Sequence, residues 1–178
     1  MMPMPHADEM LRVAAEHASE LAAPGLSPRP ERKVAVLACM DTRIDLFAML
    51  GLERGDAHII RNAGGLVTDD AIRSLSASQR LLGTEEIVVV MHHRCGLCGA
   101  SEDDFARSLI ADGAMPTWRL GAFEDLEETL RHGLTRLRSS PELPAREHIS
   151  GFVFDPDTGA LRDIEAEIPD TAAADADQ

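Results

Sequence analysis

The chain has 178 residues, with 17 Lys and Arg against 31 Asp and Glu, so its formal net charge at pH 7 is −14. Hydrophobic residues make up 44% and aromatic residues only 3%, which predicts one domain with an aliphatic core and short terminal extensions. The acidic balance excludes binding to nucleic-acid phosphates, which needs a clustered basic face, and no apolar run approaches the roughly 18 residues of a membrane span.

Residues 8–22 carry apolar side chains at helical spacing and predict an amphipathic helix. A stretch with Pro, Gly and Ser, residues 24–33, follows it. We therefore divide the chain into a helical arm with its linker (1–32), a main domain (33–168) and an acidic tail (169–178). The tail is small-residue-rich and is expected to be disordered.

The main domain alternates short apolar runs with helical patterns. Strands are predicted at 33–40, at 57–65 where the strand runs into a Gly-rich turn, and at 85–93. Helices are predicted at 45–52, 68–83, 101–111 and 122–138. Residues 148–164 read as a strand, an Asp-Pro-Asp-Thr-Gly turn and a short return strand.

Buried strands that alternate with helices predict an α/β fold, with a central mostly parallel β-sheet flanked by helices and preceded by the N-terminal helical arm. Ligands of such sheets bind beyond the carboxyl ends of the strands, where the strand order reverses. We therefore expect chemistry just after residues 38, 61 and 91.

Metal-binding residue types occur at two of these strand ends. Cys39 and Asp41 follow the first strand, and His92 and Cys95 end and follow the third. Thiolate, imidazole and carboxylate are the ligands that zinc prefers in a tetrahedral site. Each residue also has an ordinary structural explanation when taken alone, as a small buried thiol, a helix cap or a strand end. Their joint placement favours a metal site.

The chain has only three cysteines, and the third, Cys98, forms a Cys-x-x-Cys pair with Cys95. The N-terminus lacks the basic start and unbroken apolar stretch of a secretory signal. An odd, low cysteine count without export indicates a reducing compartment, so we expect a cytoplasmic protein.

These motifs resemble the β-class carbonic anhydrases. The resemblance rests on Cys-x-Asp-x-Arg at Cys39, followed about fifty residues later by His-x-x-Cys-Gly at His92, and it covers roughly residues 33–99. It implies one Zn²⁺ per chain, held by Cys39, His92 and Cys95. It implies that Asp41 is either a fourth ligand or the partner of Arg43. The spacing favours His92 over His93 as the ligand, and Cys98 is then a packed or spare thiol.

The resemblance implies an enzyme, a carbonate dehydratase that interconverts CO2 and bicarbonate through a zinc-bound hydroxide. Asp41 can close the site on the metal, and Arg43 can take the Asp41 carboxylate in a bidentate pair and so open it to water. Because higher pH favours hydroxide, we expect activity to climb through roughly pH 7.5–8.5.

The Gly-rich turn after the second strand supplies candidate substrate contacts. Its glycines let the backbone approach a small substrate, so Asn62, Gly64 and Gly65 are predicted to bind it; a tight turn into the next helix explains the same residues equally well. The resemblance also implies a homodimer or a higher homo-oligomer, with the 8–22 arm reaching across to the partner copy.

Two other functions remain open at this point. The same zinc site can hydrolyse carbonyl sulfide or carbon disulfide, because these are also small, linear and uncharged. A zinc-stabilised binding protein without activity is the third possibility, with Asp41 permanently on the metal. Arg43 counts against it, since a purely structural site does not require that partner.

Overall fold

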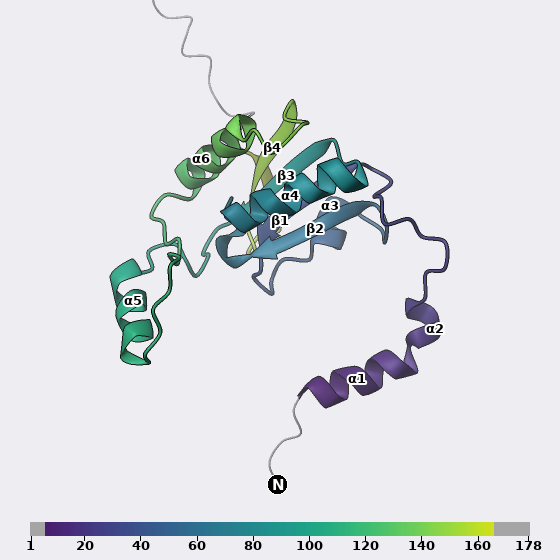
Figure 1. Cartoon of the computed structure of the whole chain (residues 1–178), viewed down its shortest axis with the longest axis horizontal. Helices are drawn as coiled ribbons and strands as arrows, with labels where there is room; N and C mark the ends of the chain where they lie inside the picture. Colours follow the sequence, from purple (N-terminus) through teal and green to yellow (C-terminus); the bar gives the residue numbers. More distant parts are fainter. Residues whose placement is uncertain (1–5, 166–178) are drawn as a thin grey trace, which may run out of the picture.

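A computed structural model of the chain describes residues 6–165 (Figure 1). Its helices are α1 (His6–Glu16), α2 (Ala18–Leu21), α3 (Leu46–Leu50), α4 (Asp69–Leu82), α5 (Glu102–Ala111) and α6 (Leu126–Ser139), with a short 3-10 helix η1 (Ala63–Gly65). Its strands are β1 (Val34–Cys39), β2 (Ala57–Asn62), β3 (Glu86–His92), β4 (His148–Phe154) and β5 (Leu161–Asp163). The predicted tail at 169–178 lies outside the described residues.

The strands form one sheet in the order β2-β1-β3-β4-β5. β1 pairs in parallel with β2 and with β3, β3 pairs in parallel with β4, and only β5 runs antiparallel to its neighbour. The predicted mostly parallel α/β sheet is therefore confirmed. Because the chain leaves β1 for β2 on one side and then crosses to β3 on the other, the strand order reverses between β1 and β3.

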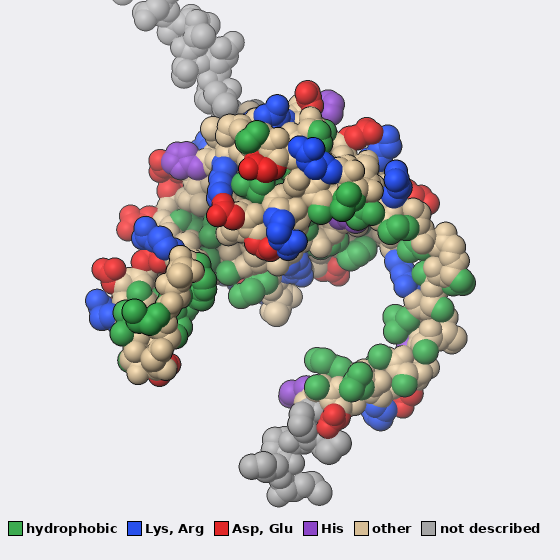
Figure 2. Space-filling model, in the orientation of Figure 1, with side chains coloured by type: hydrophobic (Ala, Val, Ile, Leu, Met, Phe, Trp, Pro, Cys, Tyr) green, Lys and Arg blue, Asp and Glu red, His purple; other side chains and the backbone are tan. Residues whose placement is uncertain are grey.

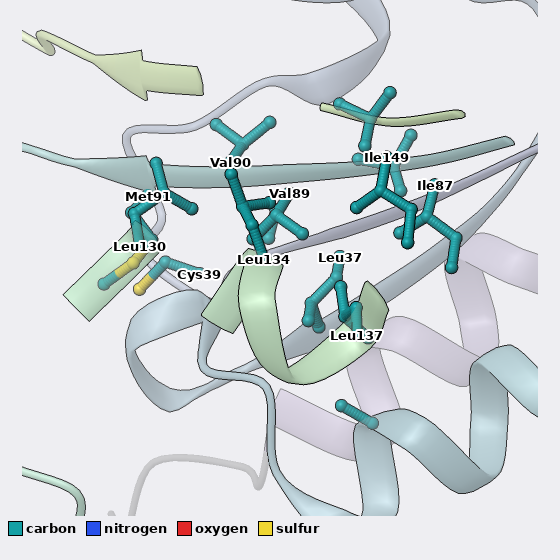
Figure 3. Close-up of a cluster of buried hydrophobic side chains, with 14 of the residues drawn as sticks. Leu37, Cys39, Ile87, Val89, Val90, Met91, Leu130, Leu134, Leu137 and Ile149 are labelled. Atoms are coloured by element: carbon teal, nitrogen blue, oxygen red, sulfur yellow. The ribbon is translucent and has the colours of Figure 1, made fainter. Parts of the chain in front are cut away.

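Two capped helices cover the sheet. α4 begins after Thr68, whose side chain accepts a hydrogen bond from the Ala71 amide, and it ends at Gly83, whose positive φ of 77° closes the helix. α4 packs on β1 and β2, and α6 packs on β3 and β4. Figure 3 shows the leucines of α6 facing the aliphatic side chains of the strands, with Cys39 at the edge of this cluster.

Two helices differ from their predicted extents. The helix expected over 8–22 divides at His17 into α1 and α2. The helix expected from residue 122 begins at Leu126, because the Asp125 carboxylate caps it by accepting from the Glu128 amide at 2.8 Å. None of the residues of α1 and α2 is buried, and both helices extend away from the sheet (Figure 1). Within residues 6–165, no helix has the length and apolar character needed to cross a bilayer.

Gly65 ends η1 where the chain passes close to the backbone of β1 and β3. A Cβ atom at Gly65 would lie 2.8 Å from the Val90 carbonyl oxygen and 2.9 Å from the Cys39 amide nitrogen, both of them backbone atoms. The φ of Gly65 is also positive, at 67°. Glycine is therefore required here both by space and by backbone conformation.

We expect Gly65→Ala to lower the free energy of unfolding by about 2–5 kcal/mol, from left-handed strain of ~1–2 kcal/mol and overpacking of ~1–3 kcal/mol. Urea denaturation at matched protein concentration measures this loss. Gly99→Ala is the control, because Gly99 has a similar φ of 75° and no atom within 4 Å of its built Cβ. It carries the strain alone, so equal losses in the two variants contradict the packing argument.

Candidate metal centre

Three metal-binding side chains meet at the carboxyl ends of β1 and β3. Cys39 is the last residue of β1, His92 is the last of β3, and Cys95 follows three residues later. All three side chains are buried, and one ligand atom from each lies within 4.8 Å of the other two. The neighbouring parallel strands bring together residues that are far apart in sequence, as the strand-end pattern predicts.

The His92 ring presents a free lone pair to the two thiols. Its Nδ1 atom donates a hydrogen bond to the His93 carbonyl oxygen at 2.9 Å, which leaves Nε2 as the acceptor nitrogen. Within residues 6–165, no atom lies in hydrogen-bonding geometry with Nε2, although it is buried. A buried polar atom without a partner is costly, and a divalent metal ion between Nε2 and the two sulfur atoms satisfies it. The donor set therefore fits a metal.

The protonation of the two thiols also favours a cation. Burial raises the pKa of Cys39, but the His92 imidazole and the amides of Asp41 and Gly64 outweigh it and lower that pKa to about 7. Burial raises the pKa of Cys95, and the nearby Cys39 raises it further. The cluster thus favours one thiolate over two, and a divalent cation is what stabilises the second.

Asp41 lies beside the donor cluster and is held by Arg43. Its Oδ1 atom accepts hydrogen bonds from the Arg43 amide and from Nε, both at 2.9 Å, and its Oδ2 atom accepts from Nη2 at 2.7 Å. These bonds keep the pKa of Asp41 well below its usual range, so the carboxylate stays ionised at neutral pH. Oδ2 stands 3.8 Å from Nε2 of His92. Of its two predicted positions, Asp41 takes the one on Arg43 in this structure.

Arg61, near the end of β2, braces the segment that carries Cys39 and Asp41. Its Nε atom donates to the Cys39 carbonyl oxygen at 2.9 Å, and its Nη2 atom donates to the Asp41 carbonyl oxygen at 2.7 Å. The sequence pattern did not predict this contact. The only sequence signal for it was the position of Arg61, a basic residue one position before the end of β2, the strand next to β1.

The three predicted substrate residues have structural contacts. The Asn62 amide group bonds the backbone of Leu66 twice, donating to its carbonyl oxygen at 2.8 Å and accepting from its nitrogen at 2.9 Å. Gly65 packs against backbone atoms of Val90 and Cys39, near the carboxyl ends of β3 and β1. Gly64 lies with Cys39 and Cys95 on the wall of a small cavity of about 200 Å³. Substrate binding by these residues stays a prediction.

The cavity beside the metal-binding residues is lined by small or apolar residues such as Ala63 and Leu97, together with Asp41 and the two thiols. A larger hollow of about 570 Å³ lies between α5 and the segment that follows it, and it contains none of the three donor residues. Size therefore does not identify the reactive site here, whereas the donor cluster does.

His93 and Cys98 both lie outside the donor cluster. The His93 side chain is exposed, while its carbonyl oxygen accepts from the His92 ring. Cys98 is also exposed, and its Sγ atom donates to the Glu124 carbonyl oxygen at 3.6 Å. Neither residue contributes an atom to the three-residue group.

Comparison with known proteins agrees with this geometry. The family model described as "Carbonic anhydrase" matches residues 34–150. The chain is 42% identical to Beta-carbonic anhydrase 1 of Mycobacterium tuberculosis over 158 residues, which are 88% of this chain and 96% of that protein. It is 37% identical to a carbon disulfide hydrolase of Acidithiobacillus thiooxidans over 152 residues, 74% of this chain and 76% of that protein.

Solved structures show the same two similarities. The crystal structure of a carbonic anhydrase from Streptococcus mutans superposes with a TM-score of 0.83 at 39% identity, covering 92% of this chain and 99% of that one. The apo form of a carbon disulfide hydrolase superposes with a TM-score of 0.71 at 31% identity, covering 97% of this chain and 96% of that one.

We expect Cys39→Ser and Cys95→Ser each to lose the bound metal, because each removes one of three donors from the cluster. The loss of affinity should exceed the roughly 10–100-fold that removal of an outer hydrogen-bond partner costs. Metal content per chain after dialysis, measured by atomic emission, tests this. Cys98→Ser is the matched control and should keep its metal, while circular dichroism checks that all three variants are folded. Full metal retention in either ligand variant contradicts the assignment.

Proposed function

The chain belongs to the β-carbonic anhydrase family, and on that premise we propose that it is a zinc-dependent carbonate dehydratase. The observation that carries this proposal is the buried, unpartnered Nε2 atom of His92 facing the Cys39 and Cys95 thiols. We assign one Zn²⁺ per chain to these three residues. Zinc bound in such a site would lower the pKa of a water molecule to about 7 and so supply a nucleophile for the carbon of CO2. The three free cysteines are typical of a reducing compartment, which supports a cytoplasmic location.

Asp41 and Arg43 orient the reaction. Arg43 occupies both carboxylate oxygens of Asp41, so the carboxylate is fixed beside the donor cluster while it remains ionised. In this role Oδ2 accepts a hydrogen bond from the attacking nucleophile. That bond turns a lone pair of the nucleophile toward the substrate carbon. Release of Asp41 from Arg43 would let the same oxygen take a position among the donors, which is the basis of the proposed gate.

The substrate side of the site suits a small uncharged molecule. The cavity of about 200 Å³ next to Cys39 is bounded by Ala63, Gly64 and Leu97. It offers apolar walls beside the Asp41 carboxylate, and its volume suits a small molecule. The amide of Gly64 is directed at the Cys39 sulfur, which helps to stabilise the thiolate that the metal requires.

Carbon disulfide or carbonyl sulfide is the second candidate substrate. The specific observation in its favour is the 37% identity to a carbon disulfide hydrolase, against 42% to a β-carbonic anhydrase. Both reactions begin with attack on the carbon of a linear molecule, so the donor cluster is common to them. The higher identity and the higher TM-score favour CO2.

We expect the zinc-loaded protein to hydrate CO2 and Asp41→Asn to lower kcat/KM by roughly 10²-fold, the lower end of what a positioned acid–base group contributes. Asparagine offers one acceptor oxygen where Asp41 offers two, so the side chain of Arg43 can no longer bond both atoms. Stopped-flow hydration with a pH indicator measures the rate, and zinc content is determined on the same samples.

Sulfide release from carbonyl sulfide and carbon disulfide, measured on the same preparation, is the comparison arm. Faster turnover of either sulfur compound than of CO2 overturns the substrate assignment and keeps the metal site. If wild type and Asp41→Asn both leave CO2 hydration at the uncatalysed rate, while the variant loses zinc or stability, the non-catalytic zinc protein is supported instead.

We also propose that the protein is at least a homodimer in which the arm contacts the partner copy. Met10, Leu11, Val13 and Leu21 of the arm are exposed, and Figure 2 shows apolar side chains along it. Burial of such surface is favourable and needs a second surface to cover it.

We expect light scattering to give a dimer or larger mass for the full chain, and Met10→Glu combined with Val13→Glu to lower that mass. The introduced carboxylates would have to be buried in the interface, which is unfavourable. Arg12→Gln changes an exposed polar residue of the same helix and should leave the mass unaltered. A monomeric full chain contradicts the proposal.

A further inference from the structure

Arg94 holds an unusual backbone conformation in the loop that follows β3. Its φ is +54°, and within residues 6–165 the only other non-glycine residue with a positive φ is Lys33. A residue with a Cβ atom is disfavoured in this left-handed region, so its persistence needs compensating contacts. Arg94 also lies directly before Cys95, one of the proposed ligands.

Two contacts of Arg94 connect the site to a distant turn. Its carbonyl oxygen accepts a hydrogen bond from Nη2 of Arg43 at 3.1 Å. Its guanidinium forms an ion pair with Asp157, in the turn between β4 and β5. The same Nη2 atom of Arg43 also donates to Asp41, so the Arg94 carbonyl helps to set where the Arg43 guanidinium lies.

The turn that presents Asp157 is itself rigidly hydrogen-bonded. The Asp155 carboxylate accepts from the Asp157 amide and from the Thr158 hydroxyl, both at 2.9 Å. The Asp155 carbonyl oxygen accepts from the Gly159 amide at 2.8 Å. The Asp157 carboxylate is thus offered from a fixed backbone, which lowers the entropy lost when it pairs with Arg94.

The charge of Asp157 also acts on Arg43. The pKa of Arg43 is raised, first by its hydrogen bonds with Asp41 and then, among smaller effects, by the negative charge of Asp157. Asp157 therefore affects the Asp41–Arg43 pair in two ways. It pairs with Arg94, whose carbonyl oxygen bonds Arg43, and its own charge stabilises the Arg43 guanidinium.

We propose that Arg94 and Asp157 are positioning residues for the reaction: their ion pair aims the Arg94 carbonyl at Arg43 and so keeps the Arg43 guanidinium on Asp41. This inference rests on the proposed function of the Asp41–Arg43 pair. Exposed ion pairs contribute little to global stability, so loss of this one should change the site locally and leave the fold intact.

Asp157→Asn and Arg94→Gly test the proposal in the zinc-loaded full chain. Glycine accepts the positive φ without strain, so Arg94→Gly removes only the side chain. The direct measurement is the solvent-exchange rate of the Arg43 Nε–H proton by NMR, assigned with Arg43→Lys. We expect exchange about fivefold faster and kcat/KM for CO2 roughly three- to fivefold lower, with zinc content unchanged; fivefold corresponds to ~1 kcal/mol.

The pair between Lys33 and Glu85 is the matched control. Its side chains are 58% and 62% exposed, against 53% and 61% for Arg94 and Asp157, and Lys33 likewise has a positive φ of 55°. It lies just before β1 and β3, at the opposite edge of the sheet from the donor cluster. We expect Glu85→Gln to leave both the Arg43 exchange rate and kcat/KM at the wild-type values.

Rescue by charge reversal completes the test. Arg94→Asp combined with Asp157→Arg restores an ion pair, and aspartate tolerates the left-handed conformation better than most residues. We expect the double variant to recover slow exchange of the Arg43 Nε–H proton. It should also recover most of the kcat/KM that Asp157→Asn and Arg94→Gly each lose.

Arg43 exchange that is unchanged in both Asp157→Asn and Arg94→Gly overturns the proposal, whatever the activity. A fall in activity that accompanies lost zinc or a lower Tm, with Arg43 exchange unchanged, also overturns it and leaves a purely structural pair. If the wild-type protein fails to hydrate CO2 while Arg43 exchange still responds, the positioning role stands and the proposed function fails.

Discussion

The parallel pairing of β1 with β3 is the constraint on which the metal centre depends. The register sets Ala38 level with Val90, so Cys39 and His92 end neighbouring strands at nearly the same height, and a slip of the register would separate these ends by about 3.3 Å per residue. The pairing is central in the sheet and buried on both strands, which gives the register strong support. Gly65 adds to it from outside, because the loop after β2 packs against backbone atoms of both strands where only glycine has room. The geometry of the donors is therefore a property of the sheet more than of the loops.

Secondary structure and the meeting of Cys39 with His92 and Cys95 were predictable because both follow from local patterns and one topological rule. Apolar runs define the strands, Thr68 and Gly83 mark the ends of α4, and parallel strands place their carboxyl ends at one edge. The break of the N-terminal helix at His17 was not predictable, since no proline or glycine marks it. The late start of α6 could have been found from Asp125, whose side chain caps the helix.

Contacts that join distant side chains to backbone atoms were beyond the sequence pattern. Arg61 bonds carbonyl groups on the neighbouring strand end, and Arg94 joins the site to a turn more than sixty residues away in the chain. An arginine in a left-handed conformation carries no local signal, because the residues that usually adopt it are glycine, asparagine and aspartate. For the Gly-rich turn, the sequence left substrate contact and tight-turn formation equally plausible. The structure documents the turn contacts of Asn62 and Gly65, and the substrate role remains open to experiment.

The cavity beside Cys39 has a consequence for how such proteins diverge. Its walls are alkyl and backbone groups, and the Asp41 carboxylate is the charged side chain among them. CO2 and its sulfur analogues are all linear and uncharged, so under the proposed function all three would meet the same walls and the same carboxylate. A change of preference between oxygen and sulfur substrates would then need substitutions only in the cavity walls, with Cys39, His92 and Cys95 retained.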